Sequence, residues 1–161
     1  MSGKVLRHAH LVTGLLLILF FVLSGQYMQH TLRLSEQPFD AQRMMYRASH
    51  LYLLLVGVMN TVVACYWQPF KSRFSRSIQG LSSGALLLAQ AAFVVAFLTE
   101  PAVVSPDRTL TWLGCVLLLI GTGLLLIARA LEYRFSKQAN ESTPLVDLSL
   151  IHISEPTRLD D

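Results

Sequence analysis

Four apolar segments of about twenty residues each constrain this chain more than any other feature of its sequence. A helix of about 20 apolar residues crosses the ~30 Å of hydrocarbon in a bilayer. A helix also bonds its backbone groups within the segment, as the membrane interior requires. The sequence therefore predicts an all-α integral membrane protein, a bundle of four transmembrane helices that span about residues 9–28, 48–67, 78–98 and 110–128.

The composition agrees with this fold class. Only 14% of the 161 residues are charged, whereas a soluble domain contains about 25%. A membrane barrel would need alternating segments of about ten residues, and the sequence contains none of that kind. We therefore expect one transmembrane domain over residues 1–137, followed by a disordered tail over residues 138–161.

The end of this tail does not look like native protein. The stretch LSLIHISEPTR, Leu148 to Arg158, resembles the in-frame translation of a sequencing-library adapter over eleven consecutive residues. Such segments are excluded from fold reasoning. We therefore expect residues 148–161 to be artefactual, which removes His152 from the candidate ligands and leaves open further native sequence, including further spans, beyond Asp147.

The distribution of basic residues predicts the orientation. A Lys/Arg excess marks the cytoplasmic side of a membrane protein, so we expect both termini to lie in the cytoplasm. The pattern fits a protein of a bacterial inner membrane. The net charge is +3. We attribute it to topology and to contact with the anionic head groups of membrane lipid, and we expect no nucleic-acid partner. Eight of the twelve Lys and Arg residues before Leu148 fall on this side: Lys4, Arg7, Lys71, Arg73, Arg76, Arg129, Arg134 and Lys137.

The first span has a second interpretation. Lys4 and Arg7 precede a short apolar stretch that ends in VLSG, a pattern that also fits a signal peptide cleaved after Ser24. Apolar and amphipathic residues continue through Tyr27 and Met28, which favours a retained helix.

Span two carries the main candidate site. Ionisable groups inside a membrane are costly and mark functional candidates. Arg43, Arg47 and His50 lie at helical spacing at its outer mouth, where we expect them to anchor the outer loops. The sharper hypothesis is that they form a pocket for an anionic ligand, a lipid head or a quinone head group. Asn60, Thr61, Ser83 and Gln90 are expected to form polar contacts between helices, with Asn60 and Gln90 bonded to each other.

The histidines leave a haem b site open. A bis-histidine haem needs two imidazoles at one depth on different helices, and His30 with His50 is the pair that meets this condition. HLVTG, His10 to Gly14, resembles an element near the quinone pocket of the cytochrome b anchor subunit of succinate dehydrogenase. Leu11 replaces that element's Arg, and a second family element is missing. The resemblance therefore implies neither a haem ligand nor a quinone ligand in this chain.

Small residues recur at helical spacing in three spans. Such stripes let membrane helices approach closely, and we expect them to serve packing inside the bundle, with dimerisation as the second interpretation. The stripes are Gly14 with Gly25, Gly80 with Gly84 and Ala91, and Gly114 with Gly121 and Ala128.

The overall pattern resembles small uncharacterised bacterial four-span membrane proteins. We expect a non-enzymatic accessory or partner-binding subunit, with a membrane-protein partner or a homo-oligomer. The alternative is a membrane electron-transfer protein that binds haem b or quinone, and a transporter comes third. The sequence contains no nucleophile–base pair, metal-ligand cluster or phosphate loop, which argues against an enzyme.

Overall fold

The computed structural model describes residues 3–34, 40–70, 72–101 and 107–141, and every regular element within them is a helix. Each of the four helices contains a stretch long and apolar enough to cross a membrane, which confirms the predicted helical membrane architecture. The helices are α1 (Gly3–Leu34), α2 (Asp40–Cys65), α3 (Arg73–Thr99) and α4 (Thr109–Glu141). They begin before the predicted spans, and α1, α3 and α4 also end after them, because an apolar run marks only the embedded part of a helix; α2 ends at Cys65, two residues before the predicted end of its span.

The structure describes only the first part of the predicted tail. Residues 138–141, expected to begin a disordered tail, continue α4 to Glu141. The predicted artefactual segment 148–161 lies outside the described residues.

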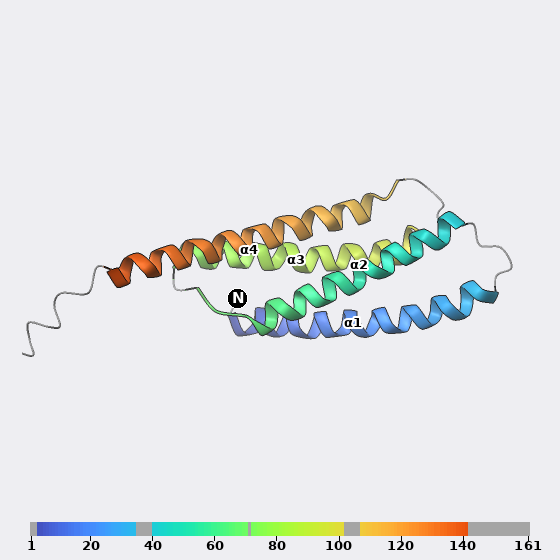
Figure 1. Ribbon diagram of the computed structural model, residues 1–161, viewed down its shortest axis with the longest axis horizontal. Coiled ribbons are helices and arrows are strands. Elements are labelled where there is room, and N and C mark those ends of the chain that lie inside the picture. The colour runs from blue at the N-terminus through green and yellow to red at the C-terminus, as the bar shows by residue number, and fades with distance from the viewer. Residues whose placement is uncertain (1–2, 35–39, 71, 102–106, 142–161) are drawn as a thin grey trace, which may run out of the picture.

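The four helices form two hairpins (Figure 1). Helix α1 packs along α2, and α3 packs along α4, while α2 and α3 join the two pairs through a smaller contact. The most apolar windows of α1 and α4 are only 17% buried, against 39% for α2 and α3. The outer faces of α1 and α4 are therefore left to lipid or to another protein. We call the end where α1 and α3 begin, and where α2 and α4 end, the basic end.

Glycines set the close crossing of α1 and α2. A Cβ atom on Gly14 would lie 2.6 Å from the Thr61 hydroxyl and 2.9 Å from the carbonyl oxygen of Gly57. Gly57 is also tightly packed, since its Cβ would lie 3.1 Å from Leu17. Only residues without a side chain allow the two backbones to approach this closely.

The stripe on α4 has the same role against α3. Cβ atoms on Gly114 and Gly121 would lie 3.0 Å from Phe93 and 2.9 Å from Leu86. The Ser82 hydroxyl on α3 donates a hydrogen bond to the Gly121 carbonyl over 2.6 Å. The expectation that these stripes pack inside the protein is confirmed for both hairpins.

The Gly80–Gly84 pair on α3 differs. A Cβ atom on either glycine would meet nothing within 4 Å, so the expectation of internal packing is wrong for this pair. Its physical reason is the hairpin arrangement: α3 turns other faces toward α2 and α4, and the Gly80–Gly84 face borders an open groove instead.

Aromatic side chains fill the junction between the hairpins. Phe93 and Phe97 of α3 belong to a buried cluster with Leu17 of α1 and Leu53 of α2. Tyr52 stacks on Phe93 with ring centroids 5.3 Å apart. This cluster holds the two hairpins together by burial of large apolar surface and by ring contacts.

A carboxylate network closes the end opposite the basic end. Glu100 follows α3 and accepts hydrogen bonds from the backbone N–H and the hydroxyl of Thr111 on α4. Arg108 lies 3.5 Å from the same carboxylate and donates to the Ser49 hydroxyl of α2 over 2.8 Å. Burial by itself would raise the pKa of Glu100, but the Thr111 and Leu110 hydrogen bonds and the Arg108 charge lower it below its ordinary value.

Candidate functional site: a groove at the basic end

A buried polar pair lies on the α1–α2 contact near the basic end. The side-chain amide of Asn60 donates from Nδ2 to the Val56 carbonyl over 2.8 Å, so its Oδ1 is free to accept. The Nδ1–H of His10 donates to that Oδ1 over 2.6 Å. Both side chains are fully buried. The Nε2 atom of His10 is then an unprotonated acceptor, and it has no hydrogen-bond partner among the described residues.

A second histidine occupies the same helix contact at the other end. Ser24 donates its only hydroxyl proton to the Phe21 carbonyl over 3.0 Å. The Nδ1 of His50, 3.0 Å from that hydroxyl oxygen, is therefore the donor. The His50 ring stacks on Phe21 with centroids 4.0 Å apart. Its Nε2 lies 3.4 Å from where a Cβ of Gly25 would be, so the missing side chain of Gly25 makes room for the ring.

The three residues of the outer-mouth site differ in exposure and in contacts. His50 turns toward α1, whereas Arg47 is exposed and Arg43 is half-buried. Among the outer residues, Arg108 pairs with the carboxylate of Glu100. His30 is exposed and lies six residues beyond Ser24, about 9 Å further along α1. The structure therefore does not bring His30 and His50 together.

The polar residues expected between helices have separate roles. Asn60 bonds His10 instead of Gln90, and the Gln90 carbonyl oxygen has no partner among the described residues. Thr61 donates to the Gly57 carbonyl of its own helix over 2.9 Å. Ser83 is buried. The expected Asn60–Gln90 bond is not formed, because the face of α2 that carries Asn60 packs against α1.

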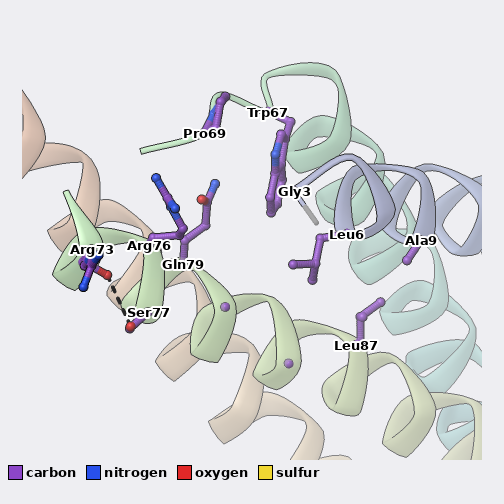
Figure 2. A pocket seen from close by; sticks show the side chains of 12 residues that line it. Gly3, Leu6, Ala9, Trp67, Pro69, Arg73, Arg76, Ser77, Gln79 and Leu87 are labelled. Carbon is purple, nitrogen blue, oxygen red and sulfur yellow. Dashed lines mark hydrogen bonds between the residues drawn. The ribbon is translucent and has the colours of Figure 1, made fainter. Parts of the chain in front are cut away.

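A groove of about 820 Å³ opens between α1, α3 and the α2–α3 connection at the basic end (Figure 2). Figure 2 shows Trp67 of the connection above Leu6 of α1, with Arg76 and Leu87 on the α3 wall. Gly80 and Gly84 contribute no side chains to the α3 wall, so the groove reaches the helix backbone there. The complete lining is Gly3, Leu6, Ala9, Trp67, Pro69, Arg73, Arg76, Ser77, Gln79, Gly80, Gly84 and Leu87.

The groove has a cationic mouth and an apolar floor. Arg73 and Arg76 lie in the first turn of α3, which contains no acidic residue. The N-cap residue Ser72 makes no side-chain capping bond. The positive end of the helix dipole and two guanidinium groups therefore coincide at this mouth. None of the described lining residues is acidic.

Two polar atoms near the groove wall lack partners. The indole N–H of Trp67 is buried and has no acceptor among the described residues. Its ring lies beside His10, with centroids 5.9 Å apart, and His10 supplies the unused Nε2 acceptor. A buried polar atom without a partner is costly, and both atoms are enclosed by protein behind the groove wall.

Sequence reasoning missed His10 and Ser24. Both lie on one face of α1, and the available signal was the spacing of three and four residues along that face, which carries His10, Gly14, Leu17, Phe21 and Ser24. The groove had no such signal, because its walls come from three segments separated in sequence. Comparison with protein-family models, curated proteins and solved structures finds no match to this chain.

Proposed function

We propose that this protein is a non-enzymatic accessory subunit of a bacterial inner membrane that works by binding, with the groove at the basic end as its binding surface. The Lys/Arg excess at this end favours a cytoplasmic location for it and for both termini. The observation that carries the proposal is the open space over Gly80 and Gly84. In a membrane, apolar surface of this kind is covered by lipid or by another helix.

The internal contacts support a binding role over a chemical one. His10 and His50 each use Nδ1 to hold α1 against α2. Glu100 and Arg108 are engaged with each other. These side chains have structural duties, whereas the groove residues on α3 leave a surface open for a second molecule.

Filling the groove tests this proposal. Gly84→Leu places a side chain into open space, so the fold should be retained, and Gly123→Leu is the matched control because its Cβ also meets nothing within 4 Å. We expect a bilayer lipid extract to raise the thermal unfolding midpoint of the detergent-purified parent and of Gly123→Leu, but not of Gly84→Leu. An equal rise in all three proteins would contradict the proposal.

The second candidate is membrane electron transfer with haem b or quinone. The observation that favours it is the unpartnered Nε2 of buried His10 beside Trp67 of the groove, an acceptor that a quinol hydroxyl would reach only if the Trp67 ring moved aside. A visible spectrum of the purified protein tests the haem arm. A Soret band that is lost in His50→Gln would replace the binding proposal with the cytochrome one, and quinone-dependent stabilisation that is lost in His10→Phe would favour the quinone.

A further inference from the structure

We propose that the groove holds one anionic phospholipid, with the phosphate at Arg73 and Arg76 and an acyl chain along Gly80 and Gly84. This inference rests on the proposed function and names the ligand class of the same site. Three features carry it: the length of the apolar floor, the charge at the mouth and the tryptophan ring at the head-group level.

The floor has the length of one bilayer leaflet. From Arg76 to Leu87, α3 rises by about 16 Å, which is roughly half of the ~30 Å hydrocarbon core. Leu6 and Ala9 of α1 form the facing wall. Because Gly80 and Gly84 lack side chains, a flexible chain can lie directly against the α3 backbone, where a larger residue would exclude it.

The mouth is suited to a phosphate. Guanidinium groups bind phosphate oxygens through paired, charge-assisted hydrogen bonds. Arg76 also donates to the Phe70 carbonyl over 3.4 Å, a long contact that anchors the side chain beside the mouth. The start of α3 adds N–H groups and a positive dipole end without a capping side chain. An anionic head group is therefore favoured over a zwitterionic one, whose cationic part these charges would repel.

Trp67 lines the groove near the level of the lipid esters. Trp67 follows the C-terminal end of α2, and its indole N–H is buried without an acceptor among the described residues. Tryptophan is enriched at this level of a bilayer because its ring is apolar and its N–H is polar. The ring of Trp67 lines the groove at this level, whereas its N–H is enclosed by protein, so the ring supplies the contact with the lipid.

A second copy of the chain fits this surface less well. Two copies in one membrane would meet through Gly80 and Gly84 as a symmetric parallel pair. That contact would place the Arg76 side chains of both copies near each other, and like charges across an interface are repulsive. A lipid phosphate instead complements the same charge.

The test compares lipids that differ only in the head group. The detergent-purified protein is incubated with phosphatidylglycerol or phosphatidylcholine of identical acyl chains, and bound lipid is counted by native mass spectrometry. We expect one retained phosphatidylglycerol per chain, at least tenfold tighter than phosphatidylcholine. The Arg73→Gln/Arg76→Gln double variant should lose this preference, and Gly84→Leu should lose retention of both lipids. Arg134→Gln and Gly123→Leu, outside the groove lining, should behave like the parent.

Each other result has a defined meaning. Equal retention of the two lipids, blocked by Gly84→Leu but unaffected by the arginine changes, would overturn the anionic ligand while leaving the groove as a binding surface. If Gly84→Leu does not change lipid retention, the lipid binds elsewhere than in the groove. A dimeric mass that disappears in Gly84→Leu would replace the lipid with a second copy. If the lipid extract stabilises the parent no more than it stabilises Gly84→Leu, the proposed function is overturned as well.

Discussion

His10 and Asn60 form the most deeply buried polar contact of the α1–α2 pair. Their 2.6 Å hydrogen bond joins residues fifty positions apart. Removing one partner leaves the other buried and unsatisfied, which costs about 1–3 kcal/mol, whereas removing both can be nearly neutral. We therefore expect Asn60→Leu to lower the free energy of unfolding by about 1–3 kcal/mol, and His10→Phe/Asn60→Leu to recover part of that loss.

A double-mutant cycle on chemically unfolded, detergent-solubilised protein measures this coupling. The cycle needs both single variants, the double variant and the parent under one set of conditions. If the losses from His10→Phe and Asn60→Leu simply add, the hydrogen bond makes no coupled contribution to stability.

Glu100 predicts an acid-sensitive step in stability. A carboxyl whose pKa is lowered on folding stabilises the protein above its ordinary pKa, and this contribution is lost as the pH falls through the lowered folded value. The unfolding midpoint should therefore decrease below about pH 4. Glu100→Gln should lower stability at pH 7 by about 1–3 kcal/mol, and its curve should approach that of the parent in acid. Parallel curves across this range would show that Glu100 is not the responsible group.

The α1–α2 crossing is more sensitive to volume than any open helix face. Gly14→Ala places a Cβ within 3.0 Å of the Thr61 backbone nitrogen and the Gly57 carbonyl oxygen, so the helices must move apart. We expect a loss of about 1–3 kcal/mol in unfolding free energy. Gly123→Ala, with nothing within 4 Å of its Cβ, should be neutral or stabilising by about 0.5–1 kcal/mol. Denaturant titration of both variants decides the point, and equal effects would show that the crossing is not close-packed.

Each helix of the two hairpins has one end at the basic end and the other at the opposite end. The basic residues therefore predict an orientation for the whole molecule. A reporter fused after Arg134 should report the cytoplasm, because α4 ends at the basic end. A reporter inserted between α1 and α2 should report the exterior. Opposite labelling in cells would reverse the orientation and would move the groove to the other leaflet.

Helix number and type could be predicted from the sequence because membrane crossing is a local property. A segment of sufficient apolar length bonds its own backbone, whatever its neighbours do. The same local reading recognised the glycine stripes on α1 and α4, which face α2 and α3 as expected. It did not separate them from Gly80 and Gly84, whose spacing is just as regular.

Which of these surfaces are covered was decided only by the tertiary structure. Helix α3 meets α2 and α4 on other faces, so the space over Gly80 and Gly84 stays open. His10 bonds Asn60, and Gln90 does not, because α2 turns that face toward α1. Contacts between helices depend on how the helices are rotated and placed against each other. Neither hydropathy nor residue spacing along a single helix contains that information.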